Sequence, residues 1–542
     1  MKSNTINHNE SVNEYIFLAL LTLIVAALAY YRAVVQMEIG PIWDTFDFLS
    51  NAMYFAGQGF GYTDLTRPPF LPFLTSLFFR LGFVYEYIIY YLDASFLVLG
   101  TIGLYLLFRV KFEPLISFLG SLLFSTFPIV ILFAGVGLTD IPSVALCIWA
   151  LYTAVLAVKR DSKFFYLSFP LLMLAFLTRY PVGFIVFPFL FYLIINRQEL
   201  SIKNMIGGIL LSILPFILVI LFFYGQFADA FYPFSTFYNT TQKAVATTYG
   251  YYHPDPLYFL KNISNYIGVG GITIVLAFSL CLLLSTITHF NNLKSKFKGL
   301  SEHRIRNNTI IKTLSLIFLM ILFSLSFTKI HYMLSEILFF VILLLAYSLL
   351  KGSKIKDLDF HFLFISWFMA FFIFHSIYDI KDDRYFVTMA PALSYFLILA
   401  FNEIWNLWTL KSNYQNLIYW TLIALLVVMT ISSAVISIHE IPDNESQIKY
   451  ISNNIQIVSQ WLKDNEPQYT DKIIYSEQWP EFSWYLRTHV RQIPSFNTTE
   501  SYENMLNTDK ADYYISFKEE LNLTNYQPIK KFGIITIYKR KP

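Results

Sequence analysis

The run YIFLALLTLIVAALAYY, residues 15–31, decides the fold class of this chain. It is long enough and apolar enough to cross a bilayer as a helix, and similar runs recur along all 542 residues. The chain is 56% apolar and only 14% charged, so it lacks the charged surface of a soluble globular protein. These features predict a polytopic α-helical membrane protein. Because the first run has no small-residue cleavage pattern, we expect it to be retained as a span.

Apolar runs of about 17–25 residues predict about thirteen transmembrane helices. We expect them near residues 15–36, 86–108, 114–133, 139–158, 164–178, 181–196, 205–225, 266–290, 310–328, 332–350, 360–378, 385–408 and 416–438. The sequence TRYP at 178–181 separates two of these spans, since proline disfavours helix for the residue before it.

The distribution of basic residues predicts the orientation. Lysines and arginines are denser in alternate short loops, which places the N-terminus in the cytoplasm by the positive-inside rule. Two long loops, 37–85 and 226–265, and the polar segment 439–542 then lie outside. This segment contains one helical pattern and three strand-like patterns, at 455–465, 472–476, 511–517 and 533–539. We expect a transmembrane domain over 1–438 and a small extracytoplasmic α/β domain over 439–542.

Composition excludes several classes of partner and site. The net charge of +3 is too small to indicate binding to nucleic acid. Cys147 and Cys281 both fall in apolar runs, so the sequence offers neither a disulfide framework nor a thiolate metal site.

Polar chemistry collects on the predicted outer side, beginning with GPIWDTFDFLSNA at residues 40–52. Ionisable groups at the ends of spans are costly to bury and so suggest a function. The outer set comprises Asp44, Asp47, Asp64, Arg67, Asp140, Arg179, His253, Asp255, Asp382, Asp383 and Arg384. Six distant segments contribute to it, which predicts a single cleft. Helix capping, solvated turns and arginines reaching the headgroups are the structural alternatives.

These residue types suggest group transfer from a lipid phosphate. A carboxylate can serve as general base for an acceptor hydroxyl, and the planar fork of arginine suits a phosphate. No inner segment is long enough to form a nucleotide-binding domain, which favours a donor carried by a membrane lipid.

Four segments together resemble the membrane glycosyltransferases of the GT-C fold. They are WDTFDFLSNAMYFAGQGFGYTDLTRPPFLPFL (43–74), TDIPSVAL (139–146), TRYPVGFIVFP (178–188) and DDRYFVTMAPAL (382–393). The chain resembles the protein O-mannosyltransferases and the bacterial aminoarabinose transferase that modifies lipid A. The resemblance implies a polyprenyl- or dolichyl-phosphate sugar donor and inverting transfer at the outer face. A lipid, a glycan or a protein could be the acceptor.

The resemblance also implies roles for particular residues. Asp44 corresponds to the base, but the family often has a second acid directly after it, where this chain has Thr45. Asp47 is therefore a rival for that role. Asp140 would orient the acceptor or the first loop. Arg384, Tyr385 and Arg179 would contact the donor phosphate, with weaker expectations of substrate binding for Arg67 and Asp383. Some relatives hold a divalent metal between the outer loops, for which His253 is the one ligand we can name.

Two other classes of function remain as alternatives. A transporter of lipid-linked sugars should place polar groups near mid-membrane and often contains repeats, and neither feature is visible in the sequence. A membrane scaffold that presents the outer domain would leave the gathering of outer acids and arginines unexplained.

Overall fold

The computed structural model describes residues 8–42, 44–242, 255–280, 307–353, 355–378, 380–407, 415–494, 496, 498–518 and 521–542. Within these ranges, nine helices are long and apolar enough to cross a membrane, which confirms a polytopic helical membrane protein. They are α1 (His8–Ile39), α4 (Tyr87–Phe108), α7 (Asp140–Lys159), α10 (Ile202–Phe227), the segment Tyr258–Leu280, α14 (Asn307–Ser326), α15 (Tyr332–Leu350), α16 (Leu358–Ile377) and α18 (Gln415–Asn444).

Shorter apolar helices lie between these spans, and prolines set several of their ends. They are α3 (Phe70–Arg80), α5 (Pro114–Thr126), α8 (Phe165–Thr178) and α9 (Val186–Ile195). Arg179 is extended, with φ −156° and ψ 114°, which confirms the predicted interruption at TRYP. The 3-10 turn η2 (Tyr180–Ile185) then leads into α9.

Two predicted spans differ from the structure in detail. Residues 114–133 form α5 and a separate short helix, α6 (Pro128–Phe133), so the expected continuous span is wrong. Pro128 has no N–H and forces extended backbone on Phe127, whose φ is −56° and ψ 131°. The span expected at 385–408 begins as a 3-10 turn, η5 (Asp383–Thr388), before α17 (Ala390–Leu407).

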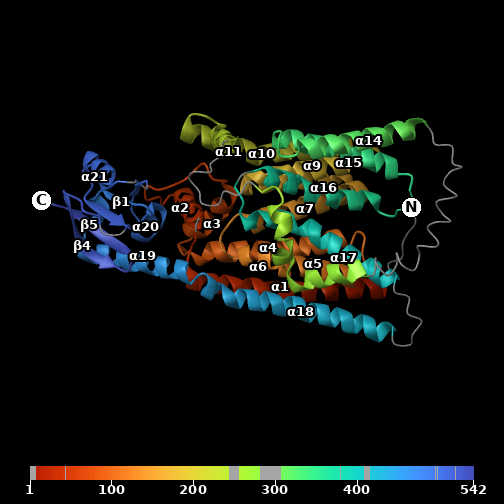
Figure 1. Ribbon diagram of the computed structural model, residues 1–542, viewed down its shortest axis with the longest axis horizontal. Helices are drawn as coiled ribbons and strands as arrows, with labels where there is room; N and C mark the ends of the chain where they lie inside the picture. The colour runs from red at the N-terminus through yellow and green to blue at the C-terminus, as the bar shows by residue number, and fades with distance from the viewer. Residues whose placement is uncertain are drawn as a thin grey trace. The chain divides into compact units, whose positions relative to one another are not determined.

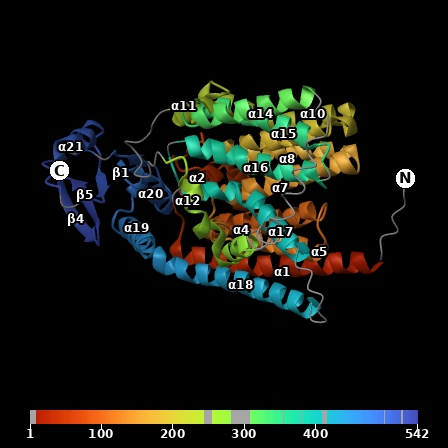
Figure 2. The same ribbon diagram turned by 45° about the vertical axis from the view of Figure 1, so that its right-hand side comes forward.

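The chain divides into two compact units. The first comprises Met1–Ala29, Ser95–Ala134 and Thr139–Ile438, and the second comprises Tyr30–Ala94, Gly135–Leu138 and His439–Pro542. In the first unit, α7 packs against α8, and α14, α15 and α16 lie side by side in both views (Figure 1 and Figure 2). It also contains α11 (Tyr232–Gln242) and α12 (Tyr258–Lys261), and a further helix follows at 263–280.

The second unit contains two first-loop helices and the C-terminal domain. The loop helices α2 (Thr45–Phe55) and α3 pack against each other. The C-terminal elements are α19 (Ser446–Asn465), β1 (Ile474–Ser476), α20 (Trp479–Leu486), β2 (Val490–Gln492), α21 (Thr499–Thr508), β3 (Tyr513–Ser516), β4 (Tyr526–Phe532) and β5 (Ile535–Arg540). Helix α20 packs against α2 as well as α19.

The strands form one mixed sheet in the order β2-β1-β3-β5-β4. β1, β2 and β3 are parallel, with Ile474 opposite both Val490 and Tyr513. β5 is antiparallel to β3 and to β4. The tight β4–β5 turn requires a left-handed residue, which Gly533 supplies with φ +55°.

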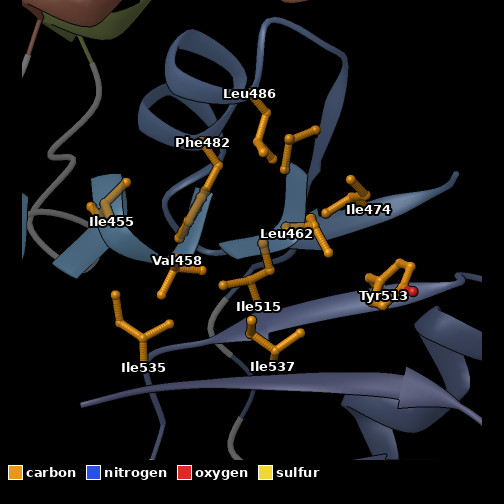
Figure 3. Close-up of a cluster of buried hydrophobic side chains, with 11 residues drawn as sticks. Ile455, Val458, Leu462, Ile474, Phe482, Leu486, Tyr513, Ile515, Ile535 and Ile537 are labelled. Atoms are coloured by element: carbon orange, nitrogen blue, oxygen red, sulfur yellow. The ribbon is translucent and has the colours of Figure 1, made fainter. Parts of the chain in front are cut away.

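Alternation along the strands gives the sheet two apolar faces. Ile474, Ile515 and Ile537 face a buried cluster completed by α19 and α20 (Figure 3). The intervening residues Tyr475, Tyr514 and Tyr538 pack on the opposite face with α21. The expected helix at 455–465 and strands at 472–476, 511–517 and 533–539 are therefore confirmed as α19, β1, β3 and β5.

Candidate functional site

The two acids that follow the first span lie on one turn of a short helix. Helix α2 begins directly after Asp44, and the Phe48 N–H donates to the Asp44 carbonyl at 3.1 Å. Residues three apart on a helix share a face, so Asp44 and Asp47 point to the same side. The Asp44 side chain is 23% exposed and that of Asp47 only 10%.

One arginine joins three carboxylates of the first loop. Arg67 Nη2 lies 3.0 Å from Asp44 Oδ1 and 2.8 Å from Asp47 Oδ2. Arg67 Nε lies 3.1 Å from Asp64 Oδ2. We call Asp44, Asp47, Asp64 and Arg67 the first-loop cluster. Sequence reasoning placed these residues in one loop, and the structure brings their charges into direct contact.

Asp47 is the most strongly held acid of the first-loop cluster. The Tyr62 hydroxyl donates to Asp47 Oδ1, while Arg67 Nε and Nη2 both donate to Oδ2. Burial raises the pKa of Asp47 to about 6, although Arg67 and Tyr62 favour its charged form. Burial by itself would lower the pKa of Arg67, but the three carboxylates raise it above its ordinary value.

Thr45 is turned toward a different partner. Its buried hydroxyl donates to the Val136 carbonyl at 3.2 Å, in the turn before α7. The same turn is held by Asp93, whose Oδ2 accepts the N–H groups of Val136 and Gly137 at 2.9 and 3.0 Å. Gly137 has φ +85°, and a Cβ there would lie 2.9 Å from Thr45 Cγ2. An acid at position 45 would therefore meet a backbone carbonyl rather than the arginine.

The C-terminal domain brings another acid to the first-loop cluster. Glu481 lies in the first turn of α20, the helix that packs against α2. Its buried Oε2 has no hydrogen-bond partner among the residues that the structure describes. Burial, with a contribution from the nearby charge of Asp47, raises the pKa of Glu481 to about 7. Sequence reasoning missed this residue; the signal available was an acid among aromatics in WPEFSWY, 479–485.

A second cluster lies in the first unit and begins with a buried ion pair. Asp140 is the first residue of α7, and Arg179 directly follows α8, which packs on α7. Arg179 Nη1 lies 2.5 Å from Asp140 Oδ1, with side chains only 9% and 1% exposed. Arg179 Nε and Asp140 Oδ2 are buried without a hydrogen-bond partner in the described part of the chain.

The turn η5 adds a second arginine to this cluster. Asp382 caps the turn by accepting the Arg384 N–H at 3.0 Å, and Arg384 Nε lies 3.0 Å from Asp382 Oδ2. The guanidinium groups of Arg179 and Arg384 both lie against the Tyr385 ring, 5.5 and 5.6 Å from its centroid. Burial raises the pKa of Asp382 against the effect of Arg384. We call Asp140, Arg179, Asp382, Arg384 and Tyr385 the arginine cluster.

Asp383 is directed elsewhere. Its Oδ1 accepts hydroxyl hydrogen bonds from Tyr258 at 2.8 Å and from Tyr266 at 2.5 Å. These bonds tie η5 to the segment Tyr258–Leu280. Nearby, the buried Lys381 ammonium donates to the carbonyls of His375 and Ser376, which end α16.

Most of the predicted residues therefore form two clusters, one in each unit, and Asp383 belongs to neither. His253, the one metal ligand that we could name from the sequence, lies outside the described residues. Within the described ranges, no three His, Cys, Asp or Glu side chains are arranged to hold a metal ion. The first-loop cluster offers carboxylates that can accept a proton, and the arginine cluster offers guanidinium groups suited to a phosphate.

Comparison with known proteins relates the chain to membrane glycosyltransferases. Residues 66–223 match the family model described as dolichyl-phosphate-mannose-protein mannosyltransferase. This range contains Arg67, Asp140 and Arg179 but neither Asp44 nor Arg384. No curated protein sequence matches the chain.

Solved structures match the chain over nearly its whole length. Two are crystal structures of ArnT from Cupriavidus metallidurans, one bound to undecaprenyl phosphate and one in the apo state, with TM-scores of 0.60 and 0.61. Each is 11% identical, and the alignment covers 95% of this chain and 97% of ArnT. An Archaeoglobus fulgidus oligosaccharyltransferase, in complex with Zn and sulfate, matches at a TM-score of 0.44 and 13% identity, over 92% of this chain and 67% of that one.

The family model and the two ArnT structures confirm the resemblance expected from the sequence. The chain has the GT-C fold of ArnT, with multiple membrane helices and a small C-terminal domain built on a mixed sheet. The family model also confirms the expected class of enzyme, a membrane glycosyltransferase.

Proposed function

We propose, starting from this kinship with membrane glycosyltransferases, that the protein transfers a sugar from a polyprenyl- or dolichyl-phosphate donor to an acceptor at the outer face. The observation that carries the proposal is the first-loop cluster, in which two carboxylates and an arginine are held together beside the first span. The acceptor is a lipid, a glycan or a protein. The ArnT structure with bound undecaprenyl phosphate supports a lipid-phosphate donor.

We assign the general base to Asp44 rather than Asp47. Both oxygens of Asp47 are held, one by Tyr62 and the other by Arg67, and its side chain is less exposed. Asp44 is the more exposed acid, so it has the better access to an acceptor hydroxyl. Asp47 and Arg67 then act by positioning Asp44.

The proposed reaction is a single displacement with inversion. The acceptor oxygen attacks the anomeric carbon while Asp44 takes the acceptor proton. The bond between the anomeric carbon and the phosphate oxygen breaks, and the lipid phosphate leaves with the bonding electrons. Arg384 and Arg179, gathered around Tyr385, stabilise the negative charge on the departing phosphate.

The proposal includes the expected topology. About thirteen apolar segments cross the membrane, with the N-terminus in the cytoplasm. Residues 1–438 form the catalytic transmembrane domain, and residues 439–542 form the domain outside. Helices α8 and α9 are each shorter than a usual span and are separated by the extended Arg179 and by η2, which supports two crossings there.

An assay of sugar transfer tests the proposal. The full chain in proteoliposomes is given labelled polyprenyl-phosphate sugars, and the product is sought in lipid, glycan and protein fractions. Asp44→Asn should lower the rate by about 10²–10⁴-fold, as expected for loss of a general base. Asp229→Asn is the matched control, since Asp229 is an exposed acid that caps its own turn.

The outcomes separate the two acids from each other. Asp47→Asn should lower transfer less than Asp44→Asn, and the reverse order would make Asp47 the base. If both variants keep full activity, the proposed mechanism is wrong. Absence of transfer from every lipid-phosphate sugar would contradict the proposed function itself.

A further inference from the structure

A pocket of about 280 Å³ lies in the second unit, at the start of α4 and the end of α20. Its walls include Tyr85, Glu86, Tyr87, Tyr90, Trp484 and Arg487. The volume is just below the range for small-molecule sites, about 300–1,000 Å³, so a single ring fits it better than a larger ligand.

The polar groups of the pocket are held in place by Trp484. Its indole N–H donates to Glu86 Oε1 at 2.6 Å, and the Arg487 guanidinium lies 3.5 Å from the Trp484 ring centroid. Phe60 and Phe79 pack on the same indole, with centroid separations of 6.4 and 6.3 Å. A carboxylate and a guanidinium are thereby fixed on one wall before any ligand arrives.

Two polar atoms of the residues that line the pocket lack a partner. Arg487 Nη1 and the hydroxyl of Tyr90, a residue 1% exposed, are buried and make no hydrogen bond to any described residue. Buried polar atoms are normally paired, so such exceptions call for a ligand or another explanation. Arg487 has φ +56° because it caps the C-terminal end of α20 in the left-handed conformation common at helix ends.

The side of the pocket formed by Tyr85 and Tyr87 is aromatic. Tyr85 and Tyr87 stack with a centroid separation of 5.0 Å and an interplanar angle of 10°, and Tyr85 is 52% exposed. Exposed tyrosines at the end of a span are typical of the aromatic belt at a membrane interface. The belt explains Tyr85 and Tyr87, but it does not explain why Glu86 and Arg487 are both held on Trp484.

We propose that this pocket binds a saccharide ring. The apolar face of the ring packs on Tyr85 and Tyr87, and its hydroxyls bond to the half-buried Arg487 and Glu86. A hydroxyl both donates and accepts, so it can satisfy a carboxylate and a guanidinium at once. A phosphate or carboxylate ligand would be repelled by Glu86, which makes a neutral sugar the better match.

Helix α20 connects this pocket with the proposed base. Its C-terminal end carries Trp484 and leads to Arg487, while Trp479 at its start contacts the Tyr62 ring with a centroid separation of 6.2 Å. Tyr62 in turn donates to Asp47. The helix is about 12 Å long at 1.5 Å per residue. Resting on the proposed function, we infer that the bound ring is a part of the acceptor remote from its reacting hydroxyl.

Direct binding measurements on the full chain test this inference without any donor. Saturation-transfer NMR with methyl glycosides of glucose, galactose and mannose probes free sugars on protein in phosphatidylcholine nanodiscs. Native mass spectrometry of nanodiscs doped with monoglucosyl diacylglycerol probes a lipid-linked sugar. Phosphatidylglycerol-doped discs and inorganic phosphate probe an anion.

We expect saccharide binding to the unchanged protein, weakened at least about tenfold (about 1.4 kcal/mol) by either Arg487→Gln or Tyr85→Leu. Tyr85 is exposed, so its replacement should leave the fold intact even if Arg487→Gln does not. Tyr15→Leu, at an exposed tyrosine on α1, is the matched control and should bind normally. Binding of the glycolipid alone would identify a membrane-linked source, and binding of glycosides a soluble one.

Several results would overturn the inference: no saccharide binding, binding unaffected by both variants, or a preference for phosphatidylglycerol or phosphate. Asp44→Asn should bind saccharide as the unchanged protein does. If saccharide binding persists while transfer is absent from every preparation, the proposed function is contradicted and the saccharide pocket is supported. If transfer persists without saccharide binding, the saccharide pocket is contradicted and the proposed function is supported.

Discussion

The first-loop cluster and the arginine cluster hold similar charges in different ways. In the first-loop cluster, one arginine that is 36% exposed contacts three carboxylates, and a tyrosine hydroxyl completes the shell of Asp47. In the arginine cluster, Asp140 and Arg179 are almost fully buried, yet each keeps a polar atom without a partner. A saturated network that retains solvent access suits proton transfer, whereas buried guanidinium groups with spare donors suit a phosphate.

The largest expected effect concerns the buried ion pair. Arg179→Gln removes one partner and leaves the Asp140 carboxylate buried, which should cost about 3–5 kcal/mol of stability. Arg67→Gln should cost less, because the carboxylates it leaves are partly exposed. The thermal unfolding midpoints of both variants in detergent provide the measurement. The double variant Asp140→Asn with Arg179→Gln should recover part of the loss, and equal midpoints for Arg67→Gln and Arg179→Gln would refute the contrast between the clusters.

A smaller effect concerns the acid that α20 brings to the first-loop cluster. The pKa of Glu481 is raised from 4.5 to about 7, so the native state binds a proton that the unfolded chain releases. Its contribution to stability is complete below about pH 4.5 and is lost as the pH rises through about 7, amounting to up to about 3 kcal/mol. Between pH 5 and 9 (an interval of about four units), the thermal unfolding midpoint should therefore fall more steeply with pH for the unchanged protein than for Glu481→Gln.

Glu500→Gln controls for the loss of an exposed acid in the same domain. Parallel pH profiles for the unchanged protein and Glu481→Gln would show that Glu481 ionises normally. That result would mean that the charge of Asp47 does not affect the ionisation of Glu481 on α20.

The smallest expected effect concerns donor affinity. Arg384→Gln should raise the KM for the lipid-phosphate sugar about tenfold, which corresponds to about 1.4 kcal/mol, and leave the KM for the acceptor unchanged. Arg384 is 18% exposed and retains Arg179 as a neighbour at Tyr385, so the loss should be partial. Arg160→Gln, at an exposed arginine, is the control. A rise in the acceptor KM instead would move Arg384 out of the phosphate site.

Local sequence patterns predicted most of the fold. The apolar runs, the break at TRYP and the alternating strands β1, β3 and β5 depend on neighbouring residues, and the structure has them. The break at Pro128 carries the same kind of signal, a proline inside an apolar run, but residues 114–133 were predicted as one span. The three-residue strand β2 was missed because its pairing depends on β1, which precedes it across α20. The seven-residue strand β4 was missed because its sequence, YQPIKKF, contains a proline and few apolar residues.

The candidate site was less predictable than the fold. The sequence alone predicted that the acids and arginines lie on the outer side of the membrane, but not which of them are in contact. The Arg67 contacts to Asp44 and Asp47 and the Asp140–Arg179 pair join residues separated by twenty or more positions. Glu481 could not be predicted from the sequence because its place near the first-loop cluster depends on α20 packing against α2.

The sequence by itself determined that this is a membrane protein with many helices and a small mixed domain, because periodicity and hydropathy are local properties. It also supplied the acids of GPIWDTFDFLSNA and the absence of an acid at Thr45. Only the tertiary structure decided that Thr45 faces a backbone carbonyl while Asp44 and Asp47 face Arg67. The physical reason is that ion pairs and hydrogen bonds depend on distances of a few ångströms, which packing sets between segments far apart in the chain.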